Sequence, residues 1–284
     1  MSSPVVVGVD GMSSSLTMVE AAAREAERHG TGLLLAHAIG WSSDHVLPWD
    51  PDGTGLGASV KGTLAEAEHR AHGVAPGVEV TSEVLVGEPS TVLGIESDRA
   101  SLAVVGKRGP TGLVGRIRGS DTGCPTASCP VLVVRGRPDP AGSVVVGIDG
   151  SPTVRDALTF AFDEASLRGA DLVVVQVRNA WTRWSHNGSH DASYDGNRPR
   201  TGRQRVLAET LAALQKTYPD VRVHHRQAGS RIGSALVDAS TEAQLVVVGA
   251  RKRGLARAAR PGSADAVVLR EAYCPVAVIG TGKE

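Results

Sequence analysis

VVVGVDGMSS at Val5–Ser14 and VVVGIDGSPT at Val144–Thr153 are two copies of one segment, and they indicate the fold class and its duplication. In each copy an aliphatic run leads through a glycine to an aspartate, Asp10 or Asp149. Short aliphatic runs bounded by turn signals are typical of buried strands in a parallel sheet. The two aspartates lie 139 positions apart, so the sequence predicts two equivalent strands in two similar units.

Two later segments recur in the same order. LAVVGKRG at Leu102–Gly109 matches LVVVGARK at Leu245–Lys252, 143 positions on, and Cys129-Pro130-Val131 matches Cys274-Pro275-Val276, 145 positions on. The slow growth of the offset indicates duplication followed by small loop insertions.

The copies are separated by GRPDPAG at Gly136–Gly142, a polar segment that we expect to be a short linker. We therefore predict two domains, residues 1–136 and 143–284, and 284 residues leave room for both. Only 3% of the residues are aromatic, so the core must be built from aliphatic side chains, as suits a parallel sheet covered by helices.

Within each copy the aliphatic runs alternate with helical stretches, which implies βαβ units. Helices are expected to begin near Ser13 and at Ser151-Pro152, and again after Gly87-Glu88-Pro89 and after Gly229-Ser230. Each domain is thus predicted to be α/β, with a five-stranded parallel sheet flanked by helices. The expected strands are Val5–Val9, Leu33–Ile39, Val78–Val86, Leu102–Val105 and Val131–Val134, then Val144–Ile148, Leu172–Val177, Val221–Arg226, Leu245–Val248 and Val276–Ile279.

The charge balance argues against two classes of partner. Thirty basic and thirty acidic residues give a formal net charge of zero, without the positive field typical of proteins that bind nucleic acids or acidic membranes. No run approaches the ~20 apolar residues of a membrane span, and MSSPVVVGVDG at the amino terminus does not resemble a signal peptide. We expect a cytoplasmic protein with neither nucleic acid nor a membrane as partner.

Metal and redox chemistry have little support in the sequence. The cysteines, Cys124, Cys129 and Cys274, are too few for a disulfide framework and are predicted to be small buried residues. His186 and His190 lie in a turn-rich segment, which disfavours a helical metal site. No metal-ligating residues are therefore predicted.

The first candidate site feature follows the first strand of each copy. Ligands of an open parallel sheet bind beyond the carboxyl ends of its strands, where the strand order reverses. Asp10 and Asp149 lie at such ends, two residues after Gly8 and Gly147. A carboxylate there can accept hydrogen bonds from a ribose or help to hold a cation. It also suits a turn at a helix amino terminus, so both interpretations stay open.

The stronger feature follows the fourth strand. Gly106-Lys107-Arg108-Gly109 is followed, after nine residues, by Gly119-Ser120. Glycines let backbone N–H groups approach anionic oxygens, and a helix that begins at Gly-Ser adds a hydroxyl and the positive end of its dipole. The second copy keeps this length from Gly249 to Gly262-Ser263-Ala264, with Lys252 in place of the second glycine.

Basic residues gather in both of these loops. On a neutral protein this favours an anionic ligand there, although a solvated basic face is the alternative. The residues are Lys107, Arg108, Arg116 and Arg118 in the first loop and Arg251, Lys252, Arg253, Arg257 and Arg260 in the second.

These features resemble the universal stress protein family, in particular its tandem-domain bacterial members, over nearly the whole chain. The resemblance is carried by the VVVG-x-DG segments, by the spacing of Gly106, Gly109 and Gly119-Ser120, and by the Cys-Pro-Val entry to the fifth strand. It implies Rossmann-like domains of the adenine nucleotide alpha hydrolase type that bind ATP, with or without Mg²⁺. It also implies that the domains pair through their fifth strands within one chain, and a homodimer is a further expectation.

In ATP-binding members the first-strand aspartate lies near the ribose, the backbone after the second strand meets the adenine, and the glycine motif wraps the phosphates. The resemblance assigns these roles to residues of both halves and assigns no catalytic residue. The implied binding residues are Gly8, Asp10, Ala38, Gly106, Lys107, Arg108, Gly109, Gly119 and Ser120 in the first domain and Gly147, Asp149, Val177, Gly249, Arg251, Gly262, Ser263 and Ala264 in the second.

The two sites depart from the family pattern in different ways. In the first copy the stretch between Ser120 and Cys129 is short and contains Gly123 and Pro125, which disfavour a helix. In the second copy Lys252 replaces a glycine. The sequence thus predicts two unequal sites, and where the motif is degenerate no cofactor is expected.

The leading interpretation is an ATP-binding protein with a regulatory role in a stress response. A ligand-free interaction module that has lost ATP binding, and a slow nucleotide hydrolase, are the alternatives. The predicted elements carry no evident nucleophile and base, so slow or absent ATP hydrolysis is expected. Trp41, Trp49, Trp181 and Trp184 follow the second strands, where they either anchor loops or stack on adenine.

Overall fold

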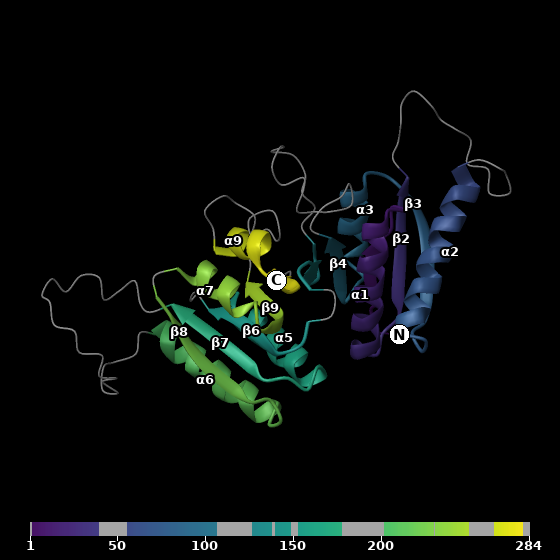
Figure 1. Cartoon of the computed structure of the whole chain (residues 1–284). Helices are drawn as coiled ribbons and strands as arrows, with labels where there is room; N and C mark the ends of the chain where they lie inside the picture. Colours follow the sequence, from purple (N-terminus) through teal and green to yellow (C-terminus); the bar gives the residue numbers. More distant parts are fainter. Residues whose placement is uncertain are drawn as a thin grey trace, which may run out of the picture.

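The computed structural model describes residues 2–39, 56–106, 127–137, 140–148, 153–177, 202–229, 231–249 and 264–280. The strands in these ranges form one ten-stranded sheet that runs through both halves of the chain, in the order β3-β2-β1-β4-β5-β10-β9-β6-β7-β8. Figure 1 shows the two halves side by side, each with its strands and covering helices. The two halves therefore share a sheet, and each contributes five neighbouring strands.

Strands and helices alternate along the chain, as predicted. The first half contains β1 (Val5–Gly8), α1 (Ser13–His29), β2 (Leu33–Ile39), α2 (Leu56–Val74), β3 (Val80–Val86), α3 (Pro89–Glu96), β4 (Leu102–Gly106) and β5 (Val131–Val134). The second contains β6 (Ser143–Ile148), α5 (Val154–Leu167), β7 (Leu172–Val177), α6 (Gly202–Thr217), β8 (Val223–Ala228), α7 (Ile232–Ala239), β9 (Ala243–Gly249), α9 (Ala264–Glu271) and β10 (Val276–Ile279).

Within each half every strand pairing is parallel. This confirms the predicted α/β class with five parallel strands in each half. The third strand of each half, however, begins two residues later than expected. Val78 and Val221 instead donate backbone hydrogen bonds to Ala75 and Tyr218, in the turns that follow α2 and α6. Both valines are buried, and their side chains anchor these turns. The same apolar side chains led to the prediction that they belong to the strands.

The halves join where β5 and β10 pair antiparallel, with Leu132 opposite Ala277. This is the pairing through fifth strands that the family resemblance implies. Just before these strands lie Cys129 and Cys274, which are buried and carry free thiols. Burial raises the pKa of each thiol to about 12, so both behave as the small apolar residues that were predicted.

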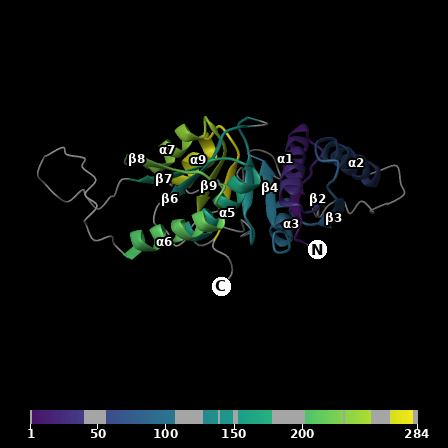
Figure 2. The same ribbon diagram turned by 90° about the horizontal axis from the view of Figure 1, so that it is seen from below.

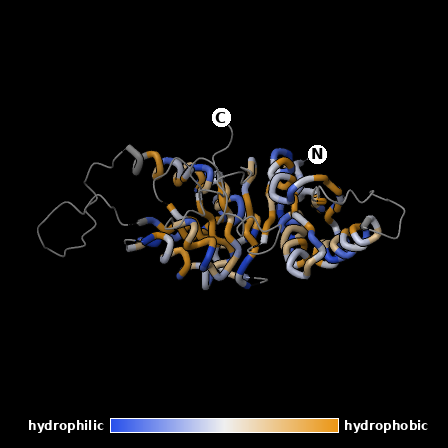
Figure 3. Tube along the Cα trace, turned by 90° about the horizontal axis from the view of Figure 1, so that it is seen from above, coloured by the Kyte–Doolittle hydropathy of each residue, from blue (hydrophilic) through white to orange (hydrophobic). Residues whose placement is uncertain are grey.

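Helices cover both faces of the sheet because side chains alternate along each strand. In β1, Val5 and Val7 pack in the core under α1 and α2, whereas Val6 belongs to the core on the opposite face. In the second half, α5 and α6 lie on one side of the sheet and α7 and α9 on the other (Figure 2). Hydrophobic residues, orange in Figure 3, recur through the middle of both halves.

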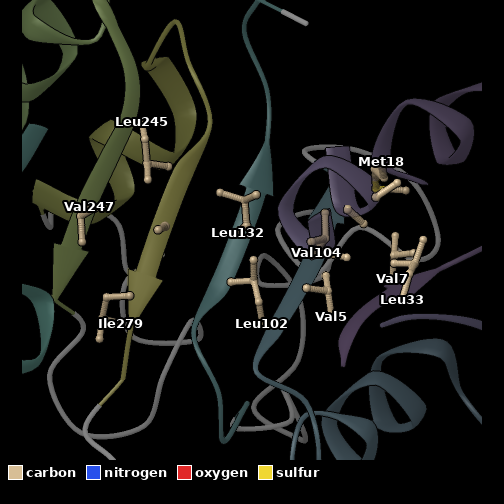
Figure 4. Close-up of a cluster of buried hydrophobic side chains, with 14 of the residues drawn as sticks. Val5, Val7, Met18, Leu33, Leu102, Val104, Leu132, Leu245, Val247 and Ile279 are labelled. Atoms are coloured by element: carbon tan, nitrogen blue, oxygen red, sulfur yellow. The ribbon is translucent and has the colours of Figure 1, made fainter. Parts of the chain in front are cut away.

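The core under α1, α2, α5 and α6 continues across the junction of the halves. Leu132 of β5 lies between Leu102 of the first half and Leu245 and Ile279 of the second (Figure 4). All four side chains are at most 4% exposed. Burial of apolar surface thus stabilises the joined sheet as well as each half separately.

The predicted linker packs tightly at both of its ends. Gly136 and Gly142 have φ angles of 70° and 122°, which favour glycine, and a Cβ on either would overlap the backbone of Tyr273 or Glu242. The backbone N–H of Arg137 also donates to the carbonyl of Tyr273. These residues of the connection are therefore fixed against the second half.

A second tie between the halves comes from Arg135, directly after β5. Its Nη1 donates to the carbonyl oxygens of Val268 and Leu269 at 2.7 and 2.6 Å, and its Nη2 donates to that of Arg270 at 2.9 Å. These are carbonyls of the last turns of α9, which favour a positive charge. A first-half arginine thus caps a second-half helix.

None of the described helices is long and apolar enough to span a membrane.

Candidate functional site

The first strand of each half lies between the second and the fourth. β1 pairs with β2 on one side and with β4 on the other, and β6 lies in the same way between β7 and β9. After β1 the chain adds β2 and β3 on one side of it and then β4 and β5 on the other, so the strand order reverses at this point. The carboxyl ends of the strands beside such a reversal form the usual ligand crevice of an open α/β sheet.

At the end of β1, Asp10 shapes the turn into α1. Its Oδ1 accepts a hydrogen bond from the backbone N–H of Met12 at 3.0 Å. The next residue, Gly11, has a φ of 77°, and a Cβ there would lie 3.2 Å from Oγ1 of Thr63 on α2. The turn interpretation of Asp10 is therefore confirmed, and its contact with a ribose stays a prediction.

His37 also lies at this end of the sheet, and the sequence analysis did not single it out. Its Nδ1 lies 2.8 Å from the carbonyl oxygen of Val9. A carbonyl can only accept, so Nδ1 carries the proton and donates. The N–H of Val9 in turn donates to the carbonyl of Ala36. β2 therefore binds Val9, the residue before Asp10, through both the N–H and the carbonyl group of Val9.

The polar character of His37 within an otherwise aliphatic strand could have identified it from the sequence. It interrupts the aliphatic strand LLLAHAI one position before Ala38, the residue assigned to the adenine by resemblance. The equivalent position of the second half, 139 residues on, is Gln176. A polar side chain at the same place of both second strands was thus visible in the repeat. What the sequence does not give is its partner, Val9, which lies 28 positions away.

The other described candidates lie at strand ends, as predicted. Gly8 ends β1 and Gly106 ends β4. Ala38 is the second-last residue of β2, paired with Leu85 of β3, and Val177 is the last residue of β7. The fold thus brings these strand ends to one edge of each half, with Gly8 and Gly106 on neighbouring strands.

In the second half the glycines have packing roles of their own. A Cβ on Gly249, the last residue of β9, would lie 2.7 Å from Oγ1 of Thr153, the buried residue that precedes α5. A Cβ on Gly147 would lie 2.7 Å from Cδ1 of Leu236 on α7. Glycine at these positions lets two helices approach the strand ends closely.

Ala264 is the first residue of α9, which begins directly after the predicted Gly262-Ser263. A Cβ on Gly233 of α7 would lie 3.1 Å from the carbonyl oxygen of Ala264. The start of α9 is therefore packed closely against α7. This arrangement gives the second half a helix amino terminus where the motif predicts one.

The remaining predicted residues lie outside the described ranges. β4 ends at Gly106 and β9 at Gly249, directly before the two predicted loops. The same holds for the tryptophans, for His186 and His190, for the start of a helix at Ser151-Pro152 and for the last helix of the first copy. The site residues concerned are Lys107, Arg108, Gly109, Gly119, Ser120, Asp149, Arg251, Gly262 and Ser263.

The chain is similar to known proteins along its whole length. A universal stress protein from Mycolicibacterium smegmatis is 34% identical over 292 residues, which cover 97% of this chain and 96% of the relative. The crystal structure of a universal stress protein from Archaeoglobus fulgidus superposes with a TM-score of 0.71 at 16% identity, over 99% of this chain and 100% of that one. This second likeness concerns the fold alone.

A universal stress protein in complex with cAMP is also similar, at 28% identity over 47% of this chain and 98% of its own, with a TM-score of 0.35. The ligand is a property of that protein. The model of the universal stress protein family matches twice, at residues 1–135 and at residues 141–280. With both halves matched and a relative of one-third identity over nearly its full length, the chain belongs to the universal stress protein family and carries two tandem domains of it.

Proposed function

We propose that the chain binds an adenine nucleotide, ATP, at the carboxyl ends of the strands in one or both halves, and acts as a regulatory stress-response protein. One observation carries the proposal. The reversal of strand order lies between β1 and β4 and between β6 and β9, and both β4 and β9 end in glycine directly before a basic, glycine-containing loop.

The residues around this point suit the three parts of a nucleotide. Backbone groups near Ala38 and Val177 face the adenine in this proposal, and Asp10 and Asp149 face the ribose. The loops after Gly106 and Gly249 hold the phosphates through backbone N–H groups and basic side chains. A bound Mg²⁺ would neutralise part of the phosphate charge.

We propose that the two sites differ in strength. In the second half the amino terminus of α9 begins at Ala264, so its positive dipole end supports a phosphate bound by the preceding residues. Asp265 in the first turn opposes that effect by its negative charge, and Lys252 adds a positive one. The first half keeps its glycines but has the shorter stretch with Gly123 and Pro125.

The proposal is tested by extracting bound nucleotides from the full chain. Protein purified without added nucleotide is precipitated with acid, and the released small molecules are identified and counted per chain. We expect an adenine nucleotide from the wild type and depletion in the double variant Gly109→Val, Gly262→Val. Gly109 and Gly262 belong to the glycine motif that the resemblance assigns to the phosphates, whereas a Cβ on Gly249 would meet Thr153 and confuse folding with binding.

Gly77→Val is the matched control, because a Cβ on Gly77 meets no atom within 4 Å. It should release as much nucleotide as the wild type. Equal release from all three proteins would place the nucleotide elsewhere on the chain. Release of a different class of molecule would contradict the proposed function. Release of no nucleotide after incubation with millimolar Mg-ATP would also contradict it and would favour the ligand-free interaction module.

A further inference from the structure

Five charged side chains meet where α1 of the first half approaches the end of α5 in the second, and we call them the junction cluster: Glu25, Arg28, His29, Glu164 and Arg168. Across the junction, Nη2 of Arg168 lies 2.7 Å from Oε1 of Glu25, and Nε2 of His29 lies 2.9 Å from Oε1 of Glu164. Within its own half, Arg168 also contacts Glu164, and Arg28 contacts Glu25. The halves are thus joined by ion pairs as well as by the sheet.

The crossing pairs are equivalent under the internal repeat. An offset of 139 positions relates the β1–β2 register to the β6–β7 register, with Val5 opposite Leu33 and Val144 opposite Leu172. The same offset relates Glu25 to Glu164 and His29 to Arg168. Each basic residue therefore contacts the glutamate of the other half. One of the two equivalent basic residues is an arginine, always charged, and the other is a histidine, which titrates near neutral pH.

Three of the five side chains are buried, whereas Arg28 and His29 are 30% and 21% exposed. The buried charges depend on their partners. The side chains of Glu164, Glu25 and Arg168 are 1%, 6% and 7% exposed. Burial alone would raise the pKa of Glu164, but the hydrogen bond from His29 and the positive charge of Arg168 bring it below its usual value. Glu164 therefore stays ionised, and a buried carboxylate that loses a partner is costly.

His29 is the member that responds to pH. Its hydrogen bond to Glu164 raises its pKa above 6.5, against the lowering effect of burial; Glu25 raises it further and Arg168 lowers it. Arg28 is the remaining charged member and lies on the same helix as His29. Because the folded value is raised, the contribution of His29 is fully present below pH 6.5 and is lost as the pH rises through the raised value.

A metal centre is the alternative use of these residues. Ligand atoms of Glu25, His29 and Glu164 all lie within 4.8 Å of one another, and two carboxylates with an imidazole can hold a divalent cation. The guanidinium of Arg168, however, contacts both carboxylates, and His29 Nε2 is engaged with Glu164. The arginine already supplies the positive charge between the two glutamates.

We propose that the junction cluster is a proton-sensitive clamp between the two domains, in which protonated His29 holds Glu164 across the junction and holds it more weakly once His29 loses its charge as the pH rises. The clamp responds to pH through one side chain, while the equivalent Arg168–Glu25 pair holds at all physiological pH values. It acts on the opening of the domain junction and does not depend on a bound nucleotide.

The test compares full-length wild type with His29→Gln and His29→Arg at pH 6 and pH 8.5, without nucleotide. Amide hydrogen exchange of β5 and β10 reports junction opening, and ratios between proteins at one pH remove the intrinsic effect of pH on exchange. At pH 6, His29→Gln should increase the opening constant roughly tenfold, since a hydrogen bond between charged groups is lost. At pH 8.5 the opening constant of His29→Gln should differ much less from that of the wild type.

His29→Arg should keep the junction protected at both pH values, because its charge is permanent, as that of Arg168 is. His224→Gln is the matched control: His224 contacts Asp171 at 2.9 Å in an exposed pair within the second half, away from the junction. This variant should match the wild type at both pH values. A wild-type-to-His29→Gln ratio that does not change with pH, or an equal effect of His224→Gln, would overturn the proposal.

Discussion

His37 of β2 donates a hydrogen bond from Nδ1 to the carbonyl oxygen of Val9, 2.8 Å away, and so fixes the backbone directly before Asp10. The bond connects the end of the second strand, assigned to the adenine, with the turn assigned to the ribose. In the proposed site, this contact would fix the distance between the backbone assigned to the adenine and the turn assigned to the ribose.

Replacing His37 should therefore affect the first site more than the fold. His37→Ala should lower the free energy of unfolding by about 1 kcal/mol, the net contribution of a typical hydrogen bond, and weaken nucleotide binding by the first half several-fold. His37→Gln, which copies Gln176 of the second half, should restore part of the affinity. Urea unfolding and nucleotide titration separate the two effects. Unchanged affinity in His37→Ala would show that this bond does not shape the site.

Gly249 is required for packing as well as predicted for binding. In Gly249→Ala the new Cβ would lie 2.7 Å from Oγ1 and 3.2 Å from Cβ of buried Thr153. Such overpacking costs about 1–3 kcal/mol of stability, measured by urea unfolding. The control Gly77→Ala adds its Cβ into open space and should change stability by less than about 0.5 kcal/mol. Equal stability of both variants would contradict the close approach of α5 to β9.

The long-range order of the chain was predictable because it follows from repeated local patterns. The aliphatic runs, their offsets and the Cys-Pro-Val entries indicate two five-stranded halves, and the family resemblance adds the pairing of β5 with β10. The start of β3 was not predictable from its pattern, because Val78 is buried by a turn that closes on Ala75. The contacts of Gly136 with Tyr273 and of His29 with Glu164 arise only when distant segments meet.

Arg135 should contribute to stability through its three bonds to the end of α9. Truncation in Arg135→Ala removes the charged donor from the carbonyls of Leu269 and Arg270, while the carbonyl of Val268 keeps the backbone N–H of Ala272. We expect a loss of about 1.5–3 kcal/mol. Arg135→Lys should recover only part of this loss, because a single ammonium does not reproduce the planar fork of the guanidinium. Chemical unfolding measures both variants. A fully stable Arg135→Ala would show that other groups satisfy the carbonyls of Leu269 and Arg270.

Glu164 should be among the more sensitive charged positions of the chain. Its side chain is 1% exposed and contacts both His29 and Arg168, so Glu164→Ala leaves a buried arginine with an incomplete set of partners. We expect a loss of about 3–5 kcal/mol, measured at pH 7. The exposed pair Glu66–Arg70 provides the control, and Glu66→Ala should change stability by less than about 1 kcal/mol. Similar small losses in both would contradict the buried network.

The thiols of Cys129 and Cys274 should be inert in the folded chain. Their pKa values of about 12 leave almost no thiolate at pH 8, and thiolate is the reactive form. Alkylation by iodoacetamide at pH 8 should be slow at both residues and become fast in denaturant, where burial is lost. Peptide mass spectrometry assigns the modified residues. Rapid alkylation of either residue in the native state would show that it is accessible.

The proposed nucleotide site of this tandem protein lies at the reversal of strand order, and calorimetric titration of the full-length wild type with Mg-ATP measures its binding. We expect saturable binding, with a stoichiometry between one and two per chain that reflects unequal halves. No binding heat at several temperatures, together with no displacement of a fluorescent adenine nucleotide by millimolar ATP, would contradict it.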